Sequence, residues 1–207
     1  MALGNWFDIL ATIFYVFSFI VAGLISALGF KAYKITKEKK FRNLSIAFLF
    51  ITLSFVVQAL TNLIVYFNLQ EGEFILSAIN SGFVIYALLT IVGFFLLAIL
   101  TLKLKDAKII ILAAAAIPAA LFFSPNFIIA FHAILLALLI LIIFKSYQNC
   151  CAKKSLSPKI VLAAFLLMAI AHIFHIAGSS AEPLFITGSI VQFAGYFALL
   201  IAILRVK

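Results

Sequence analysis

Long apolar runs separated by short polar breaks make up almost the whole chain. An α-helix needs ~20 residues to cross the hydrocarbon core of a bilayer, because it rises about 1.5 Å per residue. Each run approaches or exceeds that length, and none alternates apolar with polar residues as a strand of a membrane barrel does. The pattern predicts an all-α fold, a seven-transmembrane-helix bundle that forms a single membrane domain over residues 1–207. The predicted spans are residues 8–34, 41–68, 74–104, 107–123, 126–147, 158–178 and 183–204.

The composition agrees with this pattern. Hydrophobic residues make up 67% of the chain and charged residues 10%, whereas about a quarter of a soluble domain is charged. The mean hydropathy of +1.32 also excludes a disordered or low-complexity chain. We therefore expect a multi-pass integral protein of the cell membrane.

The distribution of charge predicts an orientation. If all seven runs cross the membrane, all 15 basic residues fall on one side of it. They are Lys31, Lys34, Lys37, Lys39, Lys40, Arg42, Lys103, Lys105, Lys108, Lys145, Lys153, Lys154, Lys159, Arg205 and Lys207. The other side carries only acidic residues, namely Asp8, Glu71, Glu73 and Glu182. Because cytoplasmic loops are enriched in lysine and arginine, the N-terminus is expected outside and the C-terminus in the cytoplasm.

The net charge of +9 does not indicate a nucleic-acid partner, because the basic residues lie in short clusters between apolar runs. The expected partners are the lipid bilayer and, at the cytoplasmic loops, anionic lipid headgroups. Few residues follow the last run, so a sensor of this kind would need a cytoplasmic protein partner for its output. The adjacent Cys150 and Cys151 form neither a disulfide framework nor a metal motif.

The three histidines of the chain all lie inside apolar runs. His172 and His175 are three residues apart in "AHIFHIAGSS", and His132 lies in the fifth run. From the helical rise, His132 and His172 should both lie about 9 Å below the outer surface, with His175 somewhat shallower. Ionisable residues within a span usually face the bundle interior or a cavity, so a functional site is expected at this level.

Other polar side chains occur at a similar depth on the second, third and last runs. Serine and threonine hydroxyls are expected to serve helix packing. Histidine and amide side chains from several helices at one depth favour a polar pocket in the outer half of the membrane. The candidate ligand-binding residues are His132, His172, His175, Asn80, Asn62, Gln58 and Gln192.

Histidine chemistry leaves three interpretations open. His132, His172 and His175 have the ligand types for zinc, copper or iron, and His132 with His172 could instead hold a haem from two helices. No carboxylate lies inside the spans to orient the imidazoles, which weakens a metal or haem site. Proton or ligand sensing fits equally, because imidazole gains its charge near neutral pH. Hydrogen-bonded histidines with a structural role are the third interpretation.

Two families with seven helices can be compared. The last run of this chain has no lysine, so no retinal Schiff base of the rhodopsin kind is expected. Sugar transporters of the SWEET kind consist of two three-helix repeats joined by a linker helix. Here residues 77–89 and 187–199 form a faint repeat that aligns Tyr86 with Tyr196, but the proline–glutamine motif of that family is absent.

The sequence thus favours a sensor-like membrane protein that binds a small ligand, an ion or a proton in an outer polar pocket. No catalytic residue is identified, and an enzyme is not expected. The alternatives are a small-solute transporter, a histidine-ligated metal or haem protein, and an accessory subunit of a membrane complex. The inner halves of the spans are poor in polar residues, which argues against a path through the bundle.

Overall fold

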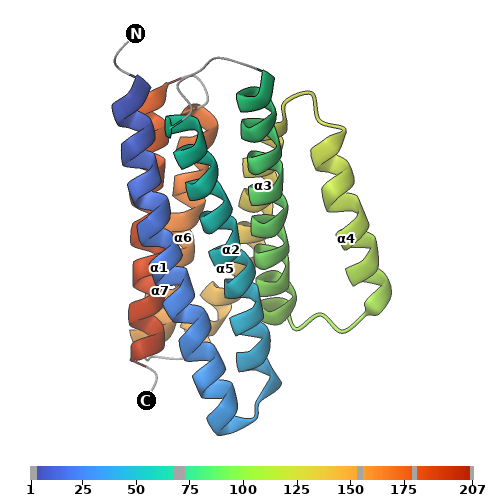
Figure 1. Cartoon of the computed structure of the whole chain (residues 1–207). Helices are drawn as coiled ribbons and strands as arrows, with labels where there is room; N and C mark the ends of the chain where they lie inside the picture. Colours follow the sequence, from blue (N-terminus) through green and yellow to red (C-terminus); the bar gives the residue numbers. More distant parts are fainter. Residues whose placement is uncertain (1–3, 68–72, 153–155, 179–180, 206–207) are drawn as a thin grey trace.

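The fold is all-helical. The computed structural model describes residues 4–67, 73–152, 156–178 and 181–205, which form seven α-helices. Their ends agree with the predicted apolar runs to within about five residues. In chain order they are α1 (Gly4–Thr36), α2 (Lys39–Phe67), α3 (Glu73–Leu102), α4 (Ala107–Phe122), α5 (Phe127–Ala152), α6 (Leu156–Gly178) and α7 (Glu182–Leu204) (Figure 1).

Local sequence explains several of the helix ends. Asp106 is the N-cap of α4, and its carboxylate accepts a hydrogen bond of 2.9 Å from the backbone N–H of Lys108. The Asn126 side chain likewise accepts from the N–H of Ile129 at the start of α5, at 3.1 Å. The longest extension beyond a predicted run is at the end of α5. No glycine or proline stops the helix there before Ala152.

Six of the described helices are long and apolar enough to cross a membrane, namely α1, α2, α3, α5, α6 and α7. The remaining helix, α4, is apolar but has only 16 residues. At the usual helical rise it is about 24 Å long, less than the ~30 Å of a bilayer core. The structure therefore confirms six of the seven predicted spans as long apolar helices.

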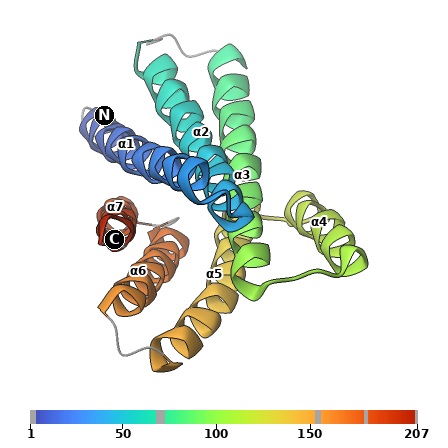
Figure 2. The same ribbon diagram turned by 90° about the horizontal axis from the view of Figure 1, so that it is seen from below.

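The six long helices form a closed ring. Each packs against its neighbour in the order α1, α2, α3, α5, α6, α7, and α7 returns to α1. Figure 2 shows this ring along its axis, with α4 standing outside it. The ring consists of two halves, α1–α2–α3 and α5–α6–α7, and corresponding helices of the two halves run in the same direction (Figure 1). Helix α4 connects the halves and packs mainly against α5.

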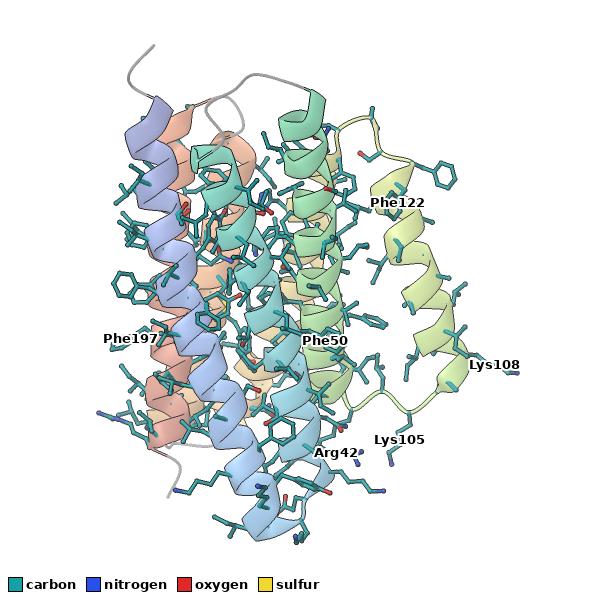
Figure 3. All side chains as sticks on the ribbon, in the orientation of Figure 1. Arg42, Phe50, Lys105, Lys108, Phe122 and Phe197 are labelled. Atoms are coloured by element: carbon teal, nitrogen blue, oxygen red, sulfur yellow. The ribbon has the colours of Figure 1, made fainter. Side chains whose placement is uncertain are left out.

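The basic residues that the structure describes gather at one end of the bundle. The N- and C-termini lie at opposite ends (Figure 1), which we call the N-terminal and C-terminal ends. All lysines and arginines of the described residues lie at or near the C-terminal end, among them Arg42, Lys105 and Lys108 (Figure 3). Four residues of the predicted charge pattern, Lys153, Lys154, Lys207 and Glu71, lie outside the described part of the chain.

Five aromatic side chains fill the middle of the ring. We call them the aromatic core: Tyr15, Phe55, Tyr86, Phe131 and Tyr196, all at least nine-tenths buried. The rings of Tyr15 and Tyr86 are 6.1 Å apart, and those of Phe55 and Tyr196 are 5.4 Å apart in an edge-to-face arrangement. Both contacts join helices that are not neighbours in the ring, so these side chains meet across its interior. The ring encloses a packed core at this level.

The outer surface of the ring is apolar. Large hydrophobic side chains are exposed on every helix; Phe17 is 49% exposed, and Phe197 points outward from α7 (Figure 3). A water-soluble protein rarely exposes apolar surface over all of its elements. The exposed belt fits a bilayer environment.

Candidate functional site

The three histidines converge at the interface of α5, α6 and α7. The Nδ1 atoms of His132 and His172 are 3.0 Å apart, which is hydrogen-bonding distance. The ring of His175 stacks on that of His132, with centroids 5.0 Å apart and an interplanar angle of 21°. All three side chains are at least 96% buried. The structure therefore brings together the histidines that the sequence placed at one depth.

Gln192 of α7 joins this group. Its side-chain oxygen lies 3.3 Å from Nε2 of His175. A carbonyl oxygen can only accept, so Nε2 of His175 carries the proton and donates it. The neutral His175 ring then presents a bare Nδ1. We call His132, His172, His175 and Gln192 the histidine cluster.

One face of α7 shapes the space around His175. Phe185, Gly188 and Gln192 follow the spacing of successive helical turns, so they share a face. The Phe185 ring packs on the His175 ring at 4.7 Å between centroids. A Cβ atom at Gly188 would lie only 3.0 Å from the imidazole and 3.1 Å from the backbone oxygen of Ala171. The glycine thus makes room for the imidazole and lets α6 and α7 approach closely.

Four buried polar atoms in and beside the cluster have no hydrogen-bond partner. They are Nε2 of His172, Nδ1 of His175, the amide nitrogen of Gln192 and the hydroxyl of Tyr196. Tyr196 is fully buried one helical turn after Gln192, and its hydroxyl lies close enough to the Gln192 side chain for the two to hydrogen-bond after a small adjustment. Leaving a buried polar group unpaired costs about 1–3 kcal/mol, and native proteins pair the great majority of such groups. Tyr196 and Gln192 can pair with each other, so Nε2 of His172 and Nδ1 of His175 are the atoms of the cluster left without a partner.

The buried serine and threonine hydroxyls behave differently. Several of them donate to a backbone oxygen one turn earlier in their own helix, so their bonding capacity is used locally. These residues are Thr52, Ser54, Thr61, Thr90 and Ser189. Ser26 and Ser45 instead bridge α1 and α2 with reciprocal bonds of 2.9 and 2.6 Å to each other's backbone oxygen. The hydroxyls therefore serve packing, as the sequence suggested.

The remaining predicted site residues lie elsewhere. The amide of Gln58 donates to the Asn62 oxygen at 3.1 Å, and the Asn62 amide donates to the Thr12 hydroxyl at 3.2 Å. This second network joins α2 to α1, and none of its hydrogen bonds reaches a histidine. Asn80 is exposed on α3 and does not take part in the histidine cluster. Of the seven predicted residues, the structure brings four together.

The cluster is not arranged as a metal site. Among the described residues, no group of three or more histidine, cysteine, aspartate or glutamate side chains is placed to hold a metal ion. The stacking of His175 on His132 accounts for this. Stacked imidazoles direct their nitrogen lone pairs side by side in parallel planes, whereas metal ligands converge on one point. This geometry does not support the expectation that His132, His172 and His175 ligate a transition metal.

Tyr196 and Phe185 were not among the predicted site residues. Tyr196 follows Gln192 by four residues, so the two share a helix face, and this spacing is a usable signal. Phe185 carries no such signal, because phenylalanine is one of the commonest residues of the chain, with 24 copies.

The chain resembles one protein family over part of its length. Residues 11–102 match a family of unknown function (DUF7521). This stretch covers α1 to α3, less than half of the chain, and includes none of the three histidines. No curated protein and no solved structure matches the chain.

Proposed function

We propose that this membrane protein binds a small polar ligand, an ion or a proton at the histidine cluster and acts as a sensor. The observation that carries the proposal is the pair of unpartnered buried ring nitrogens, Nε2 of His172 and Nδ1 of His175. A purely structural cluster would pair these atoms with one another, as the serine and threonine hydroxyls are paired with backbone oxygens.

The proposed orientation places the N-terminal end outside and the C-terminal end in the cytoplasm. It is supported by the confinement of the described lysines and arginines to the C-terminal end. The three histidines lie within about two turns of the start of α5 and of the end of α6, so they would lie in the outer half of the membrane.

A crossing by α4 completes the proposed seven-pass topology. Helix α4 begins near Lys105 and Lys108 and reaches Phe122 toward the opposite end of the bundle (Figure 3). A helix of 16 residues can cross where flanking residues extend toward the interfaces or the bilayer thins.

A small-solute transporter is the second candidate. The two halves of the ring run in the same direction, an arrangement found in transporters built from parallel repeats. The aromatic core opposes this role, because Tyr15, Phe55, Tyr86, Phe131 and Tyr196 pack against one another where a substrate would pass. A sensor needs no such passage, so the geometry favours sensing.

Thermal unfolding in lipid nanodiscs tests the binding proposal. The unfolding temperature is measured between mildly acidic and neutral pH, with added Zn²⁺, and with a panel of small neutral and charged organic solutes. We expect at least one condition to raise the unfolding temperature of the wild type but not that of Gln192→Leu. Gln58→Leu is the matched control, because it removes an amide from the separate α1–α2 network. Equal responses of the wild type and Gln192→Leu to every condition would overturn the proposal.

A further inference from the structure

We infer that the turn between α1 and α2 binds the phosphate group of an anionic phospholipid, with Arg42 as the main contact. We call residues 31–42, which include the end of α1 and the start of α2, the basic hairpin. Composition alone predicts anionic headgroups near every basic loop, whereas the structure distinguishes this one. The hairpin and the histidine cluster lie at opposite ends of the bundle (Figure 1), so the inference is independent of the proposed function.

The basic hairpin concentrates positive charge that the protein does not neutralise. It carries six of the 15 basic residues of the chain and a single acid, Glu38. The six are Lys31, Lys34, Lys37, Lys39, Lys40 and Arg42. Glu38 forms an ion pair with Lys40, the only ion pair within the part of the chain that the structure describes. The other five basic side chains of the hairpin are therefore available to an external anion.

The length of α1 places these charges among the lipid headgroups. In α1, 22 residues without a charge separate Asp8 from Lys31. They span about 33 Å, enough for the ~30 Å hydrocarbon core, so Lys31 lies at its edge. The helix continues about 8 Å further to Thr36, and the headgroup layer is about 5–8 Å thick on each side. Figure 1 shows the hairpin extending beyond the other helices at the C-terminal end, so it reaches into this layer.

Arg42 is the residue best suited to hold a phosphate. Its side chain is half-buried with Nε shielded from water, and its guanidinium donates no hydrogen bond to any described residue. The guanidinium carbon lies 6.0 Å from the centre of the Tyr33 ring, a contact that restricts its position. A guanidinium donates two parallel hydrogen bonds to one phosphate, whereas a lysine acts as a point charge. Arg42 thus provides a defined contact within an otherwise diffuse charged surface.

Lys31 lies at the same level of the hairpin as Arg42. A Cβ atom at Gly29 would lie 3.4 Å from the Phe41 backbone oxygen and 2.6 Å from the Ser45 hydroxyl, which fixes the register of α1 against α2. This register makes Lys31 and Arg42 the two charges of the hairpin closest to the hydrocarbon core. Each such cation near the membrane surface attracts anionic lipid by about a factor of five. A headgroup with net negative charge is therefore favoured over a zwitterionic one.

Native mass spectrometry of the whole protein in detergent tests the site. The protein is titrated with phosphatidylglycerol, which is anionic, and with phosphatidylcholine, which carries the same phosphate beside a positive charge. We expect the first phosphatidylglycerol to bind at least about fivefold more tightly than phosphatidylcholine. Arg42→Gln should weaken phosphatidylglycerol binding about tenfold, the loss typical of a charge-assisted hydrogen bond.

Three further variants make the result specific. Lys105→Gln removes one exposed charge from another loop at the same end and should change the affinity less than about twofold. Arg42→Lys keeps the charge but loses the paired hydrogen bonds, so it should still bind more weakly than the wild type. Lys31→Gln alters an exposed side chain without disturbing the packing and should weaken binding about fivefold, which keeps the test valid if Arg42→Gln does not fold.

Four outcomes would overturn the inference. Equal losses in Arg42→Gln and Lys105→Gln would mean that any positive charge at this end serves. Equal affinity for the two lipids would exclude selection of an anionic headgroup. Displacement of phosphatidylglycerol by millimolar inorganic phosphate would identify a site for free phosphate. Binding of a polyglutamate peptide that Arg42→Gln abolishes, without any preference between the lipids, would assign the hairpin to an acidic protein.

Discussion

His132 on α5 and His172 on α6 face each other through their Nδ1 atoms at 3.0 Å, with both side chains at least 96% buried. A hydrogen bond at this position requires the two rings to adopt opposite tautomers, because only one of the two nitrogens carries a proton. The contact therefore couples the protonation pattern of one helix to that of its neighbour.

Ring nitrogen-15 spectra test this coupling directly. We expect one ring of the pair to carry its proton on Nδ1 and the other on Nε2. His172→Phe removes the partner, and His132 should then lose the hydrogen-bond signature at Nδ1. Two rings that both carry their protons on Nε2 would show that the contact is not a hydrogen bond.

Gly188→Ala should displace the His175 ring. The added Cβ would lie 3.0 Å from two ring atoms and 3.1 Å from the Ala171 oxygen. Gly23→Ala is the matched control, because a Cβ there meets only a methyl group of Thr52 at an ordinary 3.6 Å. We expect the free energy of unfolding of Gly188→Ala to be ~1–2 kcal/mol below that of Gly23→Ala, measured by denaturant titration in micelles. Equal stability of the two variants would contradict the tight contact.

Removal of the Tyr196 hydroxyl should leave stability unchanged or increase it. This buried hydroxyl is near the Gln192 side chain but makes no hydrogen bond of good geometry, so Tyr196→Phe removes a poorly paired group. The comparison is Thr90→Val, which removes a buried hydroxyl that donates to the Tyr86 backbone oxygen at 2.8 Å. We expect Thr90→Val to cost about 1 kcal/mol in free energy of unfolding. A comparable loss in Tyr196→Phe would mean that its hydroxyl is satisfied in the protein.

The aromatic core should contribute far more to stability than the lipid-facing aromatic residues. Phe55 is 1% exposed, and truncation of such a side chain to alanine typically costs ~3–5 kcal/mol. Phe197 is 48% exposed on the outer surface (Figure 3), so Phe197→Ala should cost less than about 1 kcal/mol. Denaturant unfolding of both variants in the same micelles checks the difference. Similar losses would show that the middle of the ring is loosely packed.

Cysteine labelling on intact cells tests the orientation and the crossing by α4. Cys151 is exposed at the C-terminal end and is a native reporter for that side. In a background with Cys150→Ser and Cys151→Ser, Pro125→Cys reports the loop after α4 and Lys105→Cys the loop before it. A membrane-impermeant maleimide should label Pro125→Cys on intact cells, and Cys151 and Lys105→Cys only after lysis. Labelling of Pro125→Cys and Lys105→Cys on the same side would show that α4 does not cross.

The sequence predicted the helices well, because each long apolar run has one stable form in a bilayer. Hydropathy also predicted that His132, His172 and His175 share one level of the bundle, since that level follows from the number of residues to the helix end, and the three rings do meet. It could not give the face to which each side chain points, nor the order of helices in the ring. For this reason Gln192 and Asn80 looked equivalent in sequence, whereas the structure places one in the cluster and the other on an exposed face.

The separate position of α4 has a topological consequence. Three consecutive membrane-spanning helices start on one side of the membrane and end on the other. If the second half of the ring is to run in the same direction as the first, the chain must cross back between the two halves. In a seven-pass chain α4 provides that return, while the ring closes through α3 with α5 and α7 with α1. Two separate polypeptides, one for each half, therefore contain all the helices needed to close the ring. Co-expressed as a split protein cut within α4, they could reassemble around the same aromatic core.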